Sequence, residues 1–142
     1  MTNQDNEFSM ATPVSISPCP INVGGIAIES KDTVVNAYLV VHHHPEVEMV
    51  EGLILVIDQE NYARPQPHVW NKIGDIHFDV TAENNWPHFE HFNNAKDILY
   101  FSVKTHLKSD FAENNEFRYS EVTLENVAAL NNALINNQLS KN

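Results

Sequence analysis

Residues 47–81 read VEMVEGLILVIDQENYARPQPHVWNKIGDIHFDVT, and this stretch decides the fold. Its first part, Val47–Ile57, is rich in Val, Ile and Leu and ends in the turn-forming residues 58–61, which predicts a strand. Pro67–Ile73 and Asp75–Thr81 flank Gly74, and this pattern predicts a β-hairpin. Apolar and polar residues alternate in the second hairpin segment, as in a half-buried strand. We therefore expect an antiparallel β-sheet.

Helices are predicted on both sides of this stretch. Val34–His42 has apolar residues at the helical period, and Asp32 or Thr33 can cap its N-terminus. Ser120–Leu139 is the clearest helix, because Thr123 can cap it and an apolar stripe follows. The stripe consists of Leu124, Val127, Leu130, Leu134 and Ile135. A further strand at Ile98–Thr105 and a polar loop at 84–97 complete a chain of the α+β class.

The segment before these elements leads to the single cysteine. Met1–Thr12 is polar and is expected to be a flexible N-terminal arm, whereas residues 13–142 are expected to form one domain. Three prolines within residues 13–20 disfavour a helix and predict an extended approach. Pro20 suits the first position of a helix, so we predict a helix at Ile21–Ser30 with Cys19 at its N-terminus.

Charge and composition exclude several classes of protein. Eight Lys and Arg residues face nineteen Asp and Glu residues, giving a formal charge of −11. Binding to nucleic acid or to an anionic membrane surface needs clustered positive charge, so neither partner is expected. One cysteine allows no intrachain disulfide. Without a transmembrane-length apolar stretch or a signal-peptide pattern, the expected location is the cytoplasm.

Cys19, His68 and Asp79 are the candidate catalytic residues. A thiol at a helix N-terminus ionises more readily, because unpaired N–H groups and the helix dipole stabilise the thiolate. An imidazole on a neighbouring strand can take the thiol proton, and a carboxylate on the next strand can hold the imidazole tautomer. A hairpin turning at Gly74 would place residue 68 opposite residue 80, within one position of Asp79.

The His-x-Trp motif at 68–70 and the Asp-x-Thr motif at 79–81, with Cys19 and the Glu51-Gly52 pair upstream, resemble the transglutaminase-like superfamily of cysteine enzymes. The resemblance implies a papain/transglutaminase-like core, with the Cys19 helix packed on the sheet. It implies Cys19 as nucleophile, His68 as base and Asp79 as the acid that orients His68, and Trp70 would wall the substrate cleft. Such an enzyme, without cofactor or metal, would form a thioester while hydrolysing or transferring the acyl group of a peptide, protein or small amide or ester.

Each of these residues also has a structural interpretation. A lone cysteine such as Cys19 is often a small buried hydrophobe, and His68 can be a half-buried strand histidine. Asp79 can cap local N–H groups, and Trp70 is large and apolar enough for the core. Glu51 suits either a solvated strand face or a place near the site. The alternative function is therefore a catalytically inactive binding or interaction module of the same fold.

The remaining histidines raise a third hypothesis, a metal-binding protein. His42, His43 and His44 are consecutive, and His88 and His91 are three residues apart. A metal site needs three or four ligands that converge in the fold. Histidines at the end of a helix also interact favourably with its dipole, and the 84–97 loop suits a lid or wall over a cleft. We therefore expect no metal.

Overall fold

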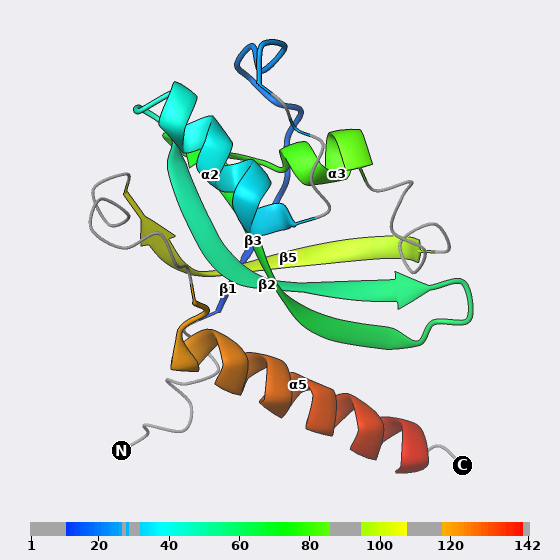
Figure 1. The fold of residues 1–142 in the computed structure, drawn as a ribbon. Coiled ribbons are helices and arrows are strands. Elements are labelled where there is room, and N and C mark those ends of the chain that lie inside the picture. The colour runs from blue at the N-terminus through cyan, green and yellow to red at the C-terminus, as the bar shows by residue number, and fades with distance from the viewer. Residues whose placement is uncertain (1–10, 27, 29–31, 86–94, 108–117, 141–142) are drawn as a thin grey trace.

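The computed structural model describes residues 11–26, 28, 32–85, 95–107 and 118–140 of the chain. Among these residues the chain is a mixed α+β protein with an antiparallel sheet and a C-terminal helix, as predicted (Figure 1). No helix within the described ranges has both the length and the apolar character needed to cross a membrane. In chain order the elements are β1 (Thr12–Val14), α2 (Thr33–His43), β2 (Glu48–Asp58), β3 (Ala63–Ile73), β4 (Ile76–Phe78), α3 (Val80–Asn85), β5 (Ala95–His106) and α5 (Glu121–Ser140).

The five strands form one curled sheet in the order β1-β5-β2-β3-β4, with antiparallel neighbours throughout. β2 and β3 form its long central hairpin, in which Gly52 pairs with His68. The segment after β1 leaves β5 and reaches the opposite edge, where Ile16 bridges His77 of β4. The Ser17 N–H donates to the His77 carbonyl at 2.8 Å. This N-terminal segment therefore links the two edges of the sheet.

The two faces of the sheet carry separate apolar clusters. One cluster contains Val69 and Phe78 together with buried residues of α2. The other contains Trp70 and Tyr100 and is covered in part by Val14 and Ile16. Because successive side chains of a strand point to opposite faces, Val69 and Trp70 belong to different clusters. His68 precedes Trp70 by two residues and shares its face.

Both flanking helices lie close to their predicted positions. Asp32 caps α2, as predicted, by accepting hydrogen bonds from the N–H groups of Val34 and Val35. α5 begins at Glu121, earlier than an N-cap at Thr123 would place it. Ser120 is the N-cap residue, because its hydroxyl oxygen accepts a hydrogen bond from the Thr123 N–H, and the Thr123 hydroxyl donates to Glu51 instead. The predicted apolar stripe is wrong in part, since its first and last members, Leu124 and Ile135, are exposed.

The predicted helix at Ile21–Ser30 is wrong over the described residues 21–26 and 28, which form turns and irregular backbone. The side chain of Asn22 accepts a hydrogen bond from the N–H of Gly24 at 2.9 Å, and the Ile26 N–H donates to the Val23 carbonyl. A side chain that bonds its own backbone two residues on favours a turn over a helix. The glycine pair adds to this preference, because glycine is a poor helix former.

The predicted strand Asp75–Thr81 ends early, at Phe78, and the next residues form the short helix α3. The predicted 84–97 loop belongs to α3 at residues 84–85 and to β5 at residues 95–97, and residues 86–94 lie outside the described part of the chain. Residues 1–10 of the predicted N-terminal arm also lie outside it, whereas Thr12 begins β1.

Candidate functional site

His68 and Asp79 form a buried hydrogen-bonded pair. Nε2 of His68 lies 2.7 Å from Oδ2 of Asp79, and the two residues are 4% and 1% exposed. Because the carboxylate is an acceptor, Nε2 of His68 is the donor in this hydrogen bond. The hairpin of β3 and β4 brings these residues together, as the sequence predicts, although its register pairs Asn71 with Phe78, one position away from the predicted register.

Asp79 is also the N-cap of α3. Its Oδ1 accepts hydrogen bonds from the N–H groups of Thr81 and Ala82 at 3.1 and 3.2 Å. Its Oδ2 accepts a second bond from the Tyr100 hydroxyl at 2.7 Å, in addition to the bond from His68. Four donors therefore surround one carboxylate. Asp79 therefore does both things that the sequence suggested: it caps local N–H groups and it pairs with His68.

Tyr100 is the residue of this cluster that the sequence did not indicate. Burial, followed by the negative charge of Asp79 and its hydrogen bond, raises the pKa of the Tyr100 hydroxyl well above its ordinary value of 10.0. The phenol therefore stays protonated and donates to Asp79. Tyr100 lies on β5, 21 residues from Asp79, so only the pairing of β5 with β2 brings the two together.

Trp70 lies beside the pair and is 1% exposed. Its ring stacks on His68 with centroids 6.1 Å apart and meets Tyr100 edge-on at 5.1 Å. Its Nε1–H donates to Nδ1 of His77 at 2.9 Å. Desolvation by burial, and then the charge of Lys72, lowers the pKa of His77, which keeps Nδ1 available as an acceptor. Trp70 thus occupies the core beside His68.

Cys19 lies in a different environment from the one predicted. It begins no helix, and its Sγ–H donates to the Ile21 carbonyl at 3.4 Å. Its N–H donates to the Glu83 carboxylate at 2.8 Å. The side chain packs against the apolar cluster of the α2 face, whereas the His68 ring stacks within the Trp70 face. Burial and the Glu83 charge raise the pKa of the thiol above 9.0, although the hydrogen bond to Ile21 opposes this shift.

The helix that packs on the His68 strand is α2, and it starts with Asp32 and Thr33. The Thr33 hydroxyl donates to the Val69 carbonyl at 2.6 Å and lies 3.4 Å from the Thr81 hydroxyl. Further along α2, the Asn36 amide donates to the same Thr81 hydroxyl at 3.0 Å. The helix N-terminus beside the histidine strand therefore carries a hydroxyl bound to backbone instead of a thiol.

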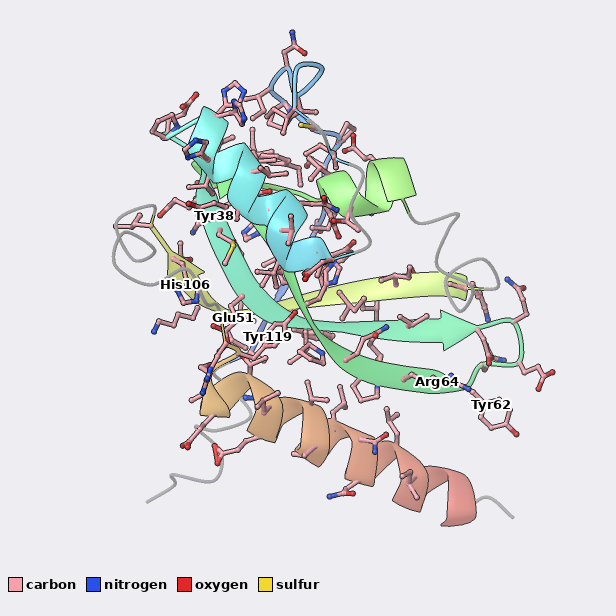
Figure 2. The ribbon with its side chains drawn as sticks, viewed as in Figure 1. Tyr38, Glu51, Tyr62, Arg64, His106 and Tyr119 are labelled. Carbon is pink, nitrogen blue, oxygen red and sulfur yellow. The ribbon has the colours of Figure 1, made fainter. Side chains whose placement is uncertain are left out.

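A second buried polar cluster surrounds Glu51, where β2, β5 and the start of α5 meet (Figure 2). Its Oε1 lies 2.8 Å from Nε2 of His106. Its Oε2 accepts bonds from the N–H and hydroxyl of Ser120 and from the Thr123 hydroxyl, at 2.6, 2.7 and 2.5 Å. Glu51 is 0% exposed, so the interpretation as a solvated strand residue is wrong.

The electrostatics of Glu51 follow from this arrangement. Burial by itself would raise its pKa, but hydrogen bonds from His106, Thr123 and Ser120 outweigh burial and lower the pKa from 4.5 to about 2. The carboxylate lies between Ser120 and His106, whereas a nucleophilic triad needs the imidazole in the middle. Glu51 therefore attaches α5 to the sheet and is not arranged as part of a serine triad.

The histidine cluster at 42–44 lies at the end of α2. His44 is the C-cap, with its Nε2 3.1 Å from the Asn22 carbonyl and its Nδ1 3.8 Å from the Glu46 carboxylate. His42 stacks on Tyr38 one helical turn earlier. In the part of the chain that the structure describes, no three His, Cys, Asp or Glu side chains are grouped as metal ligands. His88 and His91 lie outside that part.

No protein-family model matches the chain, and neither a curated protein nor a solved structure matches it. The resemblance to transglutaminase-like enzymes therefore rests on Cys19, the Glu51-Gly52 pair and the motifs at 68–70 and 79–81, and it stays a prediction.

Proposed function

We propose that the chain is a non-catalytic binding or interaction module that resembles transglutaminase-like enzymes in its His-Asp pair and lacks their activated thiol. The observation that carries this proposal is the environment of Cys19. Its thiol is hydrogen-bonded to the Ile21 carbonyl, lies beside the Glu83 carboxylate and has a raised pKa. A nucleophilic cysteine needs the opposite surroundings, namely a nearby cation or a helix N-terminus.

The start of α2 supports the same conclusion. In a cysteine enzyme of this kind, the resemblance implies a thiol at the N-terminus of the helix beside the histidine strand. Here Thr33 holds that place, and its hydroxyl is bound to the Val69 carbonyl at 2.6 Å. A hydroxyl is a much weaker nucleophile than a thiolate unless a base takes its proton. Backbone carbonyls are not such bases, so the Thr33 hydroxyl has a structural role.

The His68–Asp79 pair has a structural role that needs no substrate. Asp79 caps α3, and its second oxygen joins β3 to β5 through His68 and Tyr100. Buried polar groups that are all hydrogen-bonded specify one arrangement of the elements around them. With its side chain 6% exposed, His68 is also covered from solvent. The pair thus holds three parts of the fold together.

A second candidate is the cysteine hydrolase or acyltransferase that the sequence motifs suggest. The His68–Asp79 pair favours it, since a carboxylate that holds an imidazole is the arrangement by which a base is oriented toward a thiol. In that mechanism Cys19 would attack an amide or ester carbonyl, His68 would carry the proton to the leaving group, and water or an amine would release the acyl group from the thioester. The mechanism requires Cys19 to leave its bond to Ile21.

Alkylation of the single thiol by iodoacetamide, followed from pH 6 to pH 10, separates the two candidates. For a binding module we expect a rate that keeps rising with pH, without a plateau below pH 9, and that changes less than twofold in His68→Asn. A thiolate present below pH 8 that is lost in His68→Asn would overturn the proposal and support the hydrolase. Cys19→Ser gives the background, and circular dichroism checks that His68→Asn is folded.

A further inference from the structure

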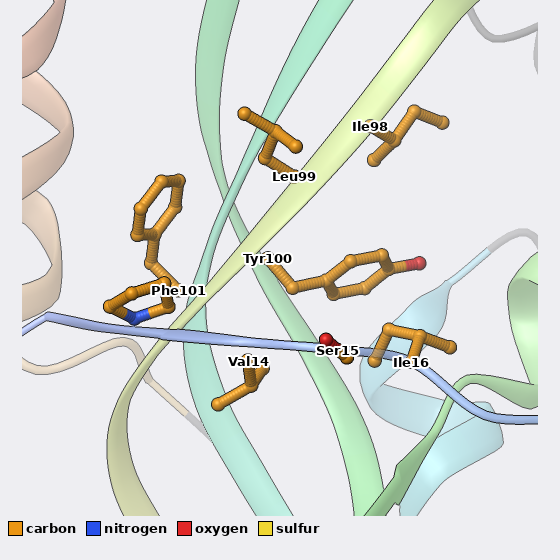
Figure 3. A pocket seen from close by; sticks show the side chains of 8 residues that line it. Val14, Ser15, Ile16, Ile98, Leu99, Tyr100 and Phe101 are labelled. Atoms are coloured by element: carbon orange, nitrogen blue, oxygen red, sulfur yellow. The ribbon is translucent and has the colours of Figure 1, made fainter.

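A cavity of about 370 Å³, open to solvent on one side, lies between the N-terminal segment and β5 and is lined by residues 13–16 and 98–101 (Figure 3). The cavity forms where the chain after β1 separates from β5. β1 pairs with β5 up to Val14 and Tyr100, and the chain then turns to the far edge of the sheet, where Ile16 bridges His77. The segment is held at both ends, so pairing with β5 cannot close the gap.

The β5 edge inside the gap is unsuited to binding another strand. The Ile98 N–H donates to the carboxylate of its neighbour Asp97 at 2.8 Å. That backbone donor is satisfied without a further strand, and a negatively charged side chain at a sheet edge disfavours strand addition. A peptide extending the sheet is therefore disfavoured as the occupant, and a small molecule is favoured.

The lining of the cavity sets the chemistry of that molecule. None of its eight lining residues is charged, and most are apolar. The Tyr100 hydroxyl is committed to Asp79, so the ring is the part of this residue that remains to contact a ligand. A charged ligand would lose its hydration without a partner of opposite sign, which is costly. The exposed Ser15 contributes a hydroxyl that can bond an alcohol or amide at the mouth.

The volume of the cavity limits the size of the ligand. Small-molecule sites are usually cavities of about 300–1,000 Å³ lined mostly by apolar side chains. At roughly 30 Å³ for each water-sized group, the space admits about twelve such groups. We propose that this cavity binds an uncharged aliphatic molecule of medium length that carries one hydroxyl or amide, with its hydrocarbon chain against the ring of Tyr100. This inference rests on the proposed binding function, for which it supplies a ligand class.

The site is connected to the buried pair through Tyr100. The Tyr100 ring meets Trp70 at 5.1 Å and His68 at 5.9 Å, and its hydroxyl is bound to Asp79. A ligand that lies on this ring therefore contacts the residue that joins β5 to the His68–Asp79 pair. The pair would hold the wall of the binding site in place.

Titration of the full chain with 1-octanol, followed by methyl NMR, tests the proposal. We expect saturable shifts of the methyl groups of Val14, Ile16, Ile98 and Leu99. Ser15→Phe fills the mouth at an exposed position and should weaken binding at least tenfold. Leu124→Phe makes a comparable change at an exposed position on α5 and should leave binding unchanged. Thermal unfolding of both variants checks that they are folded.

Several results would overturn the inference. These are equal binding of octanoate, unchanged binding by Ser15→Phe, or shifts centred on Leu53, Leu55 and Leu130, which line the separate apolar pocket beneath α5. Failure of this inference is distinct from failure of the proposed function. If Cys19 is alkylated slowly and octanol does not bind, the proposed ligand class is wrong but the non-catalytic function still stands. If Cys19 reacts as a thiolate below pH 8, the non-catalytic function is wrong even if octanol binds.

Discussion

Nε2 of His106 lies 2.8 Å from Oε1 of Glu51, a glutamate that is 0% exposed. The other oxygen of this carboxylate accepts three hydrogen bonds from Ser120 and Thr123 at the start of α5. Anions at a helix N-terminus are stabilised by its unpaired N–H groups and dipole. Glu51 therefore joins β2, β5 and α5 at one point, and the attachment of α5 depends on its charge.

This arrangement predicts an acid-sensitive contribution to stability. The pKa of Glu51 is lowered to about 2 in the folded protein, below its ordinary 4.5, so its stabilisation is complete above pH 4.5 and is lost as pH falls toward 2. The difference in unfolding free energy between the wild type and Glu51→Gln should shrink by about 1–2 kcal/mol between pH 6 and pH 3.5. Urea unfolding at both pH values measures it.

The matched control for this prediction is Glu46→Gln. The Glu46 side chain is 56% exposed, so its removal should change the unfolding free energy by less than about 0.5 kcal/mol at either pH. A Glu51→Gln protein whose stability differs from the wild type by the same amount at pH 6 and pH 3.5 would contradict the lowered pKa.

Adding one methyl group at Gly52 is expected to lower the stability of the fold strongly. A Cβ at this position would lie 2.1 Å from the Phe101 carbonyl oxygen and 2.8 Å from the Trp70 ring. The register of β2 against β5 shifts between Glu51 and Gly52, which brings the backbones to this close approach. We expect Gly52→Ala to lower the unfolding free energy by about 3 kcal/mol or more, measured by urea unfolding.

Gly25→Ala is the control for this substitution. A Cβ at Gly25 meets no atom within 4 Å, so the change should be neutral or should stabilise the protein by up to about 1 kcal/mol. If both alanine variants unfold at the same urea concentration, close packing at Gly52 is not what requires the glycine.

Local patterns predicted most of the fold, and the failures have physical reasons. The His68–Asp79 pair could be predicted because a hairpin turn at Gly74 brings together residues only 11 apart. The Glu51 cluster could not be predicted, since its partners lie 55 to 72 residues away in sequence. For Cys19, the proline at position 20 indicated a helix start, but the Asn22 side chain and Gly24 favour a turn.

Tyr100→Phe tests how much the hydrogen bond from the Tyr100 hydroxyl to Asp79 contributes to stability. The change removes the hydroxyl that lies 2.7 Å from Asp79 Oδ2 and leaves a buried carboxylate with one bond fewer. A hydrogen bond to a charged group contributes about 1.5–3 kcal/mol, so we expect a loss of that size in the unfolding free energy. Tyr62→Phe, at a 52% exposed tyrosine, should change it by less than about 0.5 kcal/mol. Equal losses in the two variants would mean that the Tyr100 hydroxyl adds nothing.

Glu83→Gln tests the environment of Cys19 without touching His68. The Glu83 charge contributes to the raised pKa of the thiol, so its neutralisation should lower that pKa and increase the thiolate fraction at any pH below it. A partly exposed charge pair is worth about 0.2–1 kcal/mol, which corresponds to a rise of up to about fivefold in the iodoacetamide rate at pH 8. Glu60→Gln, at an exposed turn, should leave the rate unchanged. A slower reaction in Glu83→Gln would mean that the carboxylate activates the thiol, for example by orienting a base, and would support the hydrolase over the binding module.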